Sequence, residues 1–330
     1  MIAAALILLA ISPVRLEGAA DYSRNHGGEV LVVREAGRTV WDQQSTAAKS
    51  GRRYACLSIT KSLAAVTFLA AQSDGLLRLD EPASETLTEW KKSPLKREIR
   101  IRDLLNLQAG LFSGYETLYR RNIRDKNRAA LALGMSAAPG NQFAYGPADY
   151  EVLEDLLARK LKPRGLTPLG YVQKRLFGYL SASTEGWRKD LSGNPYFSTG
   201  ALLSVPQFLR FGEIILAQGR PSLTRWFSAD LAPLNDRRSG LPIYALGFWR
   251  NQGVRLTGAT VINIERSIGE TTELKFWKRA CISRDAPADL LALVGSGGQR
   301  LYVVPSRKLV ILRLGNTRNF DDAAFLRELF

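Results

Sequence analysis

Ser58 and Lys61 have the types and spacing of a serine nucleophile with a lysine base. They occur in the sequence Ser58-Ile59-Thr60-Lys61. On a helix, residues three apart lie on one face with about 5–6 Å between their Cβ atoms, so the amine can reach the hydroxyl. Apolar surroundings disfavour charged lysine and lower its pKa, as a base that works near neutral pH requires. The pair therefore predicts acyl transfer through Ser58.

A second Ser-x-x-Lys sequence, Ser93-Pro94-Leu95-Lys96, competes with this assignment. It contains a proline and lies among charged residues, which is typical of an exposed segment. Ser58 instead begins the most apolar segment of the chain, 58–73, whose sequence SLAAVTFLAA is hydrophobic on nearly every side. That pattern indicates a helix buried all round, and it favours Ser58 over Ser93.

Other catalytic chemistries lack the residues they need. The chain has one histidine, His26, and no Gly-x-Ser-x-Gly sequence, which disfavours a Ser-His-Asp triad. Its two cysteines have no metal-ligand spacing, so we expect neither zinc nor another cofactor. An oxidising compartment would permit a disulfide between Cys56 and Cys281, but the apolar stretch around Cys56 favours a small buried side chain.

The elements that must position this pair form three blocks along the chain. Segments 29–34 and 38–42 read as a hairpin, and segments 299–305 and 309–314 read as a second one. We expect strands from both ends of the chain to share one antiparallel sheet, with a closing helix at 321–329.

Helices fill the middle of the chain. The predicted helices are 104–107, 148–161 and 205–217; Pro147 suits the start of the second, and Ser204 with Gln207 forms a capping box for the third. Strands, then helices, then strands predict an α+β sandwich whose helices form a second lobe. We expect a single catalytic domain, 21–330, with an α/β lobe from about 21–80 and 240–330 and a helical lobe from about 81–239.

The segment 56–82 (CLSITKSLAAVTFLAAQSDGLLRLDEP) resembles the nucleophile helix of the serine β-lactamase and penicillin-binding-protein superfamily, especially class C β-lactamase-related hydrolases. Further segments resemble the family in the same order, over roughly residues 29–320. They are IRDLLNLQAGL (101–111), Pro139-Gly140 with Phe143-Ala144-Tyr145, 198–211, YALGFW (244–249) and VGSGGQRLYVVP (294–305). The resemblance implies a β-lactamase/transpeptidase-like fold.

The resemblance also implies roles for individual residues. Ser58 would be the nucleophile, Lys61 its base, and Tyr145 the tyrosine that shares proton transfer and protonates the leaving group. The strand that ends at Gly295 would match the family's edge strand. The backbone N–H near Ser296 would then form the oxyanion hole with that of Ser58.

Two departures from the family's motifs bear on the substrate. Tyr145-Gly146-Pro147 stands where penicillin-recognising members have Tyr-x-Asn, and Leu293-Val294-Gly295 stands where they have Lys-Thr-Gly. The chain thus lacks the amide and the cation that bind β-lactams or peptides. It is nearer the family's esterases and amidases, including relatives of 6-aminohexanoate-dimer hydrolase, whose third motif is Gly-rich.

Two features near this third motif have competing interpretations. Gly295, Ser296 and Gly297 are read as a substrate-binding turn where the backbone approaches the ligand, or as a simple bend before a strand. Arg300 is read as a substitute for the missing cation, or as an outward, solvated strand residue.

The N-terminus and the charge balance bear on location and partners. Residues 1–11 are apolar but too short to span a membrane, and Gly18-Ala19-Ala20 resembles a signal-peptide cleavage site before Asp21, with a buried N-terminal helix as the alternative. We therefore expect a signal peptide at 1–20 and a periplasmic or secreted protein.

The 46 Lys and Arg against 31 Asp and Glu leave a net charge of +15, with basic clusters at 91–100 and 120–128. These suit anionic envelope polymers or a solvated helix face, and no nucleic-acid-binding motif accompanies them.

The sequence-based hypothesis is a secreted serine hydrolase that cleaves a small ester, amide or peptide-like substrate through a Ser58 acyl-enzyme. Two alternatives remain at this stage. One is a β-lactamase or D-alanyl-D-alanine carboxypeptidase. The other is a non-catalytic envelope protein with a penicillin-binding fold.

Overall fold

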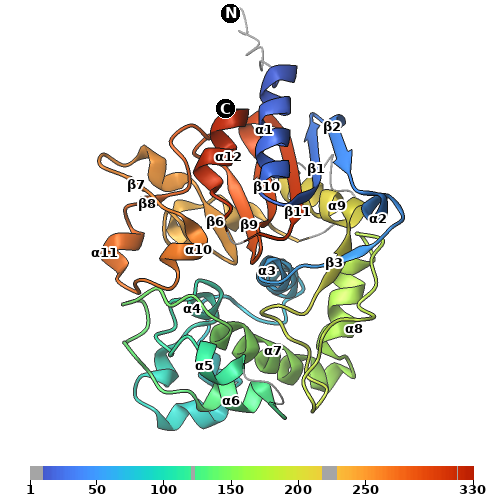
Figure 1. Cartoon of the computed structure of the whole chain (residues 1–330). Coiled ribbons are helices and arrows are strands. Elements are labelled where there is room, and N and C mark those ends of the chain that lie inside the picture. Colours follow the sequence, from blue (N-terminus) through green and yellow to red (C-terminus); the bar gives the residue numbers. More distant parts are fainter. Residues whose placement is uncertain (1–9, 120–122, 218–228, 318) are drawn as a thin grey trace, which may run out of the picture.

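An antiparallel sheet of seven strands, in the order β2-β1-β11-β10-β9-β6-β5, forms the upper part of the molecule in Figure 1. The computed structural model describes residues 10–119, 123–217, 229–317 and 319–330. Strands from the two ends of the chain are neighbours, as predicted, because β1 pairs with β11. The strands are β1 (Gly28–Glu35), β2 (Arg38–Gln44), β5 (Tyr244–Ala245), β6 (Phe248–Arg250), β9 (Leu291–Gly295), β10 (Gln299–Val304) and β11 (Leu309–Gly315).

Tight turns at special backbone conformations fix the registers of the hairpins. Ala36 and Gly37 join β1 to β2 with φ angles of 49° and 82°, and Leu246 and Gly247 join β5 to β6 with φ angles of 48° and 80°. Two successive residues in the left-handed region are typical of turns whose twist matches that of the flanking strands. The predicted hairpin at the N-terminal end is confirmed.

Helices cover both faces of the sheet (Figure 1), and its strands are largely buried except for the edge strand β2, which is mostly exposed. Helices α1 (Pro13–Asn25) and α12 (Asp322–Leu329) lie together on one face. Helix α9 (Val205–Leu216) packs on β10 and β11 at the other face. A Cβ atom at Gly212 would lie 2.5 Å from Cγ1 of Val310, so the close approach of α9 requires glycine. The sequence placed this helix in the helical lobe, whereas it packs on the sheet.

The helices between residues 101 and 172 gather below the sheet, with α3 (Ile59–Ser73) between the two parts (Figure 1). Helices α3 and α7 agree with the predicted segments 58–73 and 148–161. The helix expected at 104–107 begins earlier, at Ile101, because the side chain of Asp103 accepts a hydrogen bond from the backbone N–H of Arg100. The helices of this part are α4 (Ile101–Leu105), α5 (Tyr115–Leu118), α6 (Lys126–Ala132), α7 (Ala148–Leu161) and α8 (Pro168–Val172).

The short elements complete the fold around these layers. They are α2 (Thr46–Lys49), β3 (Arg53–Ala55) paired with β4 (Leu202–Ser204), β7 (Thr260–Val261) paired with β8 (Ala280–Cys281), α10 (Ile264–Ser267) and α11 (Leu274–Trp277). Cys56 and Cys281 are free and buried.

The predicted cleavage position between Ala20 and Asp21 falls in the middle of α1. Ala19 and Ala20 have no exposed surface, and Leu16 is 4% exposed, because α1 packs on α12 and β1. Cleavage there would separate these side chains from the sheet, so residues 13–25 match the alternative of a buried N-terminal helix. Residues 1–9 lie outside the described part, and within that part no helix is long and apolar enough to cross a membrane. Secretion stays a prediction.

Candidate active site

Ser58 lies at the start of α3, directly after a residue in a strained conformation. Leu57 has a φ of 48°, in the left-handed region, and Ser58 immediately precedes the first helical residue, Ile59. The backbone N–H of Cys56 donates to the carbonyl oxygen of Ala201, which anchors the chain just before this bend. The bend and the anchor together place the Ser58 side chain at a cavity wall instead of in the core around α3.

Lys61 Nζ donates a hydrogen bond of 3.1 Å to Oγ of Ser58. The contact expected from the three-residue spacing is therefore present. A second hydrogen bond, of 3.3 Å, runs from Nζ to the carbonyl oxygen of Ser198. Lys61 is 1% exposed, and both of these acceptors are uncharged.

Burial governs the charge of Lys61. Loss of solvation lowers its pKa to about 7, although the carboxylates of Glu151 and Asp149 partly offset the effect. A large share of the molecules therefore carries a neutral amine at neutral pH, 3.1 Å from the serine hydroxyl. A neutral amine at that distance can accept the hydroxyl proton.

Tyr145 lies beside the same amine in an aromatic cluster. Its ring centroid is 4.9 Å from Nζ of Lys61, and its ring packs on that of Trp249 with centroids 5.5 Å apart. Burial raises the pKa of the phenol to about 12, while hydrogen bonds with Ser58 and Trp249 lower it in part. Tyr145 is thus protonated at neutral pH and suited to donate a proton, whereas Lys61 is suited to accept one.

A buried carboxylate behind Lys61 was missed by the sequence reasoning. Glu151, on α7, has no exposed surface, and it accepts hydrogen bonds from Oγ of Ser198 at 2.5 Å and from the backbone N–H of Phe197. These bonds hold the segment whose carbonyl oxygen accepts from Lys61. A charged residue inside a helix whose neighbours Tyr150 and Val152 are apolar was the signal that could have revealed it.

The end of β9 forms the wall opposite the helices. The strand is interior in the sheet order, not an edge strand as predicted. However, β6 pairs only with Leu291 and Ala292, so the last three residues of β9 extend beyond it with one free edge. A Cβ atom at Gly295 would lie 2.6 Å from the carbonyl oxygen of Cys56. Glycine is therefore required where this strand passes the nucleophile segment.

The turn after β9 brings Ser296 to the cavity, while Gly297 lines a neighbouring hollow. Gly297 and Gly298 have φ angles of 74° and 78°, which favour glycine at both positions. The backbone of Gly298 is fixed from two sides, because its N–H donates to Glu265 and its carbonyl oxygen accepts from Arg313. The turn is thus a supported structure and not a loose bend.

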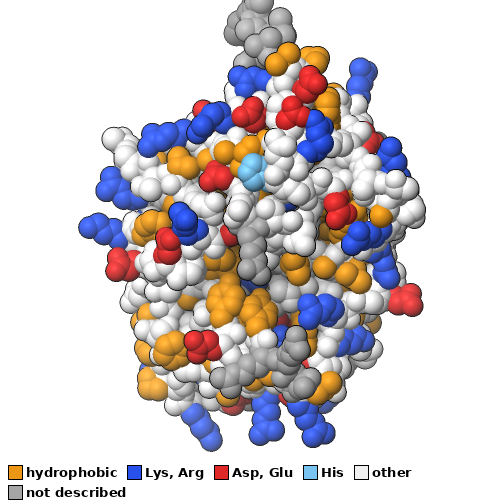
Figure 2. Space-filling model, in the orientation of Figure 1, with side chains coloured by type: hydrophobic (Ala, Val, Ile, Leu, Met, Phe, Trp, Pro, Cys, Tyr) orange, Lys and Arg blue, Asp and Glu red, His pale blue; other side chains and the backbone are white. Residues whose placement is uncertain are grey.

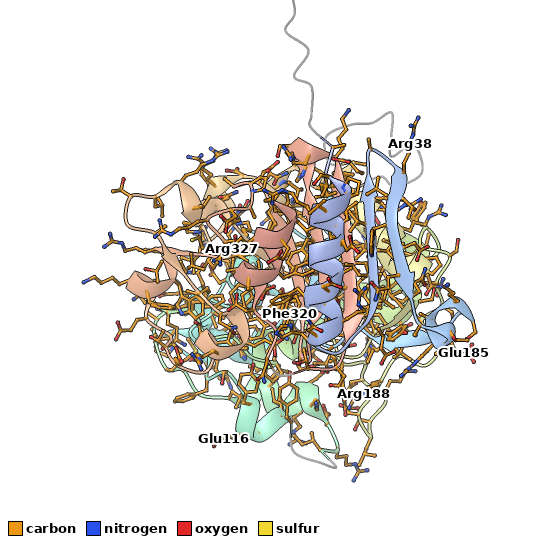
Figure 3. The ribbon with its side chains drawn as sticks, turned by 45° about the horizontal axis from the view of Figure 1, so that its top comes forward. Arg38, Glu116, Glu185, Arg188, Phe320 and Arg327 are labelled. Atoms are coloured by element: carbon orange, nitrogen blue, oxygen red, sulfur yellow. The ribbon has the colours of Figure 1, made fainter. Side chains whose placement is uncertain are left out.

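Arg300 is fully buried, so the expectation of an outward, solvated side chain is wrong. Its guanidinium forms ion pairs with Asp322 at 2.7 Å and Glu265 at 3.1 Å and donates to the carbonyl oxygen of Gly295. Phe320, labelled beside α1 in Figure 3, lies over the same group. The Arg300 side chain points away from the face of the sheet that α9 covers. The face toward which it points is covered by α1 and α12. Arg300 therefore supports the wall of the site and is not a free cation.

These walls enclose a cavity of about 450 Å³. Figure 2 shows hydrophobic side chains gathered near the middle of the face that is turned toward the viewer. The lining comes from four parts of the chain besides the start of α3 and the end of β9, and the sequence did not indicate the contribution of the segment 188–199. The lining residues are Leu57, Ser58, Tyr115, Tyr119, Lys126, Tyr145, Arg188, Tyr196, Thr199, Ile264, Glu265, Ile268, Val294 and Ser296.

The two predicted basic clusters differ in exposure, because Lys91, Lys92, Arg97 and Arg100 of the first are exposed. Lys and Arg side chains are spread over the face in Figure 2. Within the cluster 120–128, residues 120–122 lie outside the described part, and Lys126 is 4% exposed in the cavity wall. In the part of the chain that the structure describes, no group of three or more His, Cys, Asp or Glu side chains is arranged to hold a metal ion.

Comparisons with known proteins agree with this architecture. A family model described as Beta-lactamase matches residues 15–329. No curated protein sequence matches the chain. A class C beta-lactamase from Rhodobacter sphaeroides has a similar structure, with a TM-score of 0.63 and 17% identity over 94% of this chain and 97% of that one.

Two further solved structures are similar. A protein from Bacteroides dorei, proposed to be a beta-lactamase, has a TM-score of 0.65 and 15% identity over 96% of this chain and 95% of that one. A protein from Bacillus anthracis, proposed to be a 6-aminohexanoate-dimer hydrolase, has a TM-score of 0.63 and 17% identity over 94% of this chain and 78% of that one. At these identities the likeness establishes the fold.

Proposed function

The chain belongs to the beta-lactamase family, and from this premise we propose that it is a serine hydrolase that cleaves an ester or amide through an acyl-enzyme on Ser58. The observation that carries the proposal is the 3.1 Å hydrogen bond between Ser58 Oγ and a fully buried lysine amine. A solvated lysine would be protonated at neutral pH and unable to act as a base.

The proton route follows from the two pKa values. The neutral amine of Lys61 takes the proton of Ser58 as Oγ attacks the carbonyl carbon and forms a tetrahedral intermediate. Collapse of the intermediate breaks the bond to the leaving group, which takes a proton from Tyr145, while Lys61 returns a proton to the phenol. Water then attacks the acyl carbon and gives a proton to Lys61. The bond to Oγ of Ser58 breaks, Oγ takes that proton from Lys61, and the acid is released.

The developing negative charge needs donors at the cavity wall. We assign this role to the backbone N–H groups of Ser58 and Ser296, both of which line the cavity. The proximity of Gly295 to the Cys56 carbonyl oxygen supports the assignment, since it brings the two backbone segments together.

Two features favour an ester or simple amide over a β-lactam. Pro147, the N-cap of α7, occupies the position where penicillin-recognising members have asparagine. No side-chain amide is therefore available at that position to bind the substrate. Leu293 and Val294 leave the end of β9 apolar, and Arg300 is bound to carboxylates. A β-lactamase or D-alanyl carboxypeptidase remains the second candidate because of the family itself.

Steady-state hydrolysis of 4-nitrophenyl butyrate and of a penicillin tests the proposal, with Ser58→Ala as the matched control. We expect turnover of the ester that Ser58→Ala lacks, and little or no turnover of the penicillin. Efficient penicillin hydrolysis would restore the β-lactamase alternative. Equal ester turnover by the wild type and Ser58→Ala would contradict the assignment of the nucleophile.

A further inference from the structure

Lys126 is a buried cation in the cavity wall that forms no ion pair with a described residue. It is 4% exposed, and its Nζ lies 3.8 Å from the ring centroid of Tyr196 and 5.3 Å from that of Tyr119. Aromatic faces attract a cation but do not neutralise it. The mechanism on Ser58 makes no use of this residue.

Arg188 supplies a second positive charge at the same wall. Its guanidinium carbon lies 5.5 Å from the ring centroid of Tyr196, so this ring contacts both cations. Figure 3 labels Arg188 below the sheet, on the side of the molecule where the helices lie. An arginine is protonated at every accessible pH, and within the described part of the chain no carboxylate forms an ion pair with it.

Two carboxylates, Glu151 and Asp190, attract Lys126 electrostatically but are hydrogen-bonded to other groups. Asp190 accepts hydrogen bonds from the backbone N–H groups of Lys126, Ser192 and Asn194. Glu151 is bonded to Ser198 and Phe197 on the inner side of the wall.

Across the cavity, Glu265 forms an ion pair with Arg300 and accepts a hydrogen bond from the backbone N–H of Gly298. Among the described residues, no carboxylate forms an ion pair with Lys126 or Arg188, so the Lys126–Arg188 wall presents two cations without a contacting counter-ion.

We propose that Lys126 and Arg188 bind a carboxylate that the substrate carries at a distance from its scissile bond, an inference that rests on the proposed function. The preferred substrates are then half-esters or half-amides of dicarboxylic acids, or esters whose leaving group bears a carboxylate. Tyr119 and Tyr196 exclude water from the ammonium, which strengthens its attraction for an anion. Arg188, at the more exposed position, adds a planar donor group suited to a carboxylate.

Matched substrate pairs test the preference and distinguish the two sources of the carboxylate. On the acyl side, the 4-nitrophenyl monoester of adipic acid is compared with 4-nitrophenyl methyl adipate. On the leaving-group side, the butyrate ester of 4-hydroxybenzoic acid is compared with that of 4-hydroxybenzamide. We expect kcat/KM to favour the anionic member of at least one pair by about tenfold or more, as one buried charge-assisted contact provides. A ratio near one in both pairs would overturn the proposal.

Variants assign the preference to this wall. Lys126→Met should bring the ratio close to one, and Arg188→Met should lower it several-fold. Lys189→Met is the matched control, because Lys189 is an exposed neighbour outside the cavity lining and its loss changes the net charge equally. If the ratio survives in both Lys126→Met and Arg188→Met, or falls equally in Lys189→Met, the assignment is wrong.

Binding of adipate separates this inference from the proposed function. Calorimetry with Ser58→Ala protein should detect adipate binding that weakens at least tenfold when Lys126→Met is added. This readout needs no turnover, so it holds even if the wild type cleaves none of the esters. Absence of adipate binding to Ser58→Ala would overturn the inference, and absence of ester turnover would instead contradict the proposed function.

Discussion

Two buried basic side chains of the candidate site, Lys61 and Arg300, have opposite surroundings. Lys61 lies among aromatic rings and donates only to uncharged oxygens, while Arg300 forms ion pairs with Asp322 and Glu265. Burial lowers the pKa of Lys61 to about 7, whereas the carboxylates beside Arg300 raise the pKa of its guanidinium. In the proposed mechanism, the side chain that moves a proton, Lys61, has no carboxylate of a described residue in contact with it. The side chain that supports the wall, Arg300, is in contact with two.

Replacing Lys61 gives the largest expected effect on activity. Lys61→Met removes the base while filling the same volume, so ester turnover should fall about 10³–10⁴-fold. The unfolding free energy at pH 7 should stay the same or increase, because a buried amine with a lowered pKa destabilises the folded state. Turnover and thermal melting check both points. The exposed Lys49 gives the control Lys49→Met, and activity retained in Lys61→Met would refute the base assignment.

Replacing Arg300 should act on stability rather than on chemistry. Arg300→Met leaves Asp322 buried at 1% exposure without its ion-pair partner, so the unfolding free energy should fall by about 3–5 kcal/mol. Urea titration measures the change. Arg327→Met, on the exposed side of α12 and labelled in Figure 3, is the control and should have little effect. An unchanged urea midpoint for Arg300→Met would show that the buried ion pairs do not support the wall.

Tyr145→Phe should lower ester turnover about 10²-fold while preserving the packing on Trp249. The ring is kept and only the proton donor is lost. Tyr171→Phe is the matched control, since the Tyr171 hydroxyl donates to Asp74 at the far end of α3. If the two variants are equally active, Tyr145 does not protonate the leaving group.

The pH profile should show the ionisation of Lys61 directly. Ester kcat/KM should rise about tenfold between pH 6 and pH 8, because the amine loses its proton through a pKa of about 7. The same group makes stability pH-dependent. The pKa of Lys61 in the folded state lies below the ordinary lysine value of 10.5, so the unfolded chain binds more protons. This contribution to the unfolding free energy therefore rises with pH from about 7 to 10.5. A flat kinetic profile would disagree with a neutral lysine base.

Local patterns were enough to predict several elements and the contact between Ser58 and Lys61. The apolar segment at 58–73, the hairpin at 29–42 and the Ser58–Lys61 contact depend on residues close in sequence. The surroundings of Arg300 depend on α1 and α12 covering a second face of the sheet, which strand alternation cannot reveal. The positions of Glu151 and Lys126 likewise depend on packing between distant segments, 188–197 above all, where the sequence has no recognisable motif.

Intact mass spectrometry after exposure to a fluorophosphonate tests the central claim most directly, with wild type and Ser58→Ala compared side by side. The mechanism predicts one covalent adduct on the wild type and none on Ser58→Ala. Labelling should be slow in Lys61→Met, because the reagent requires an activated serine. An unlabelled wild type, or an adduct that persists in Ser58→Ala, would contradict the claim that Ser58 is the nucleophile of a serine hydrolase.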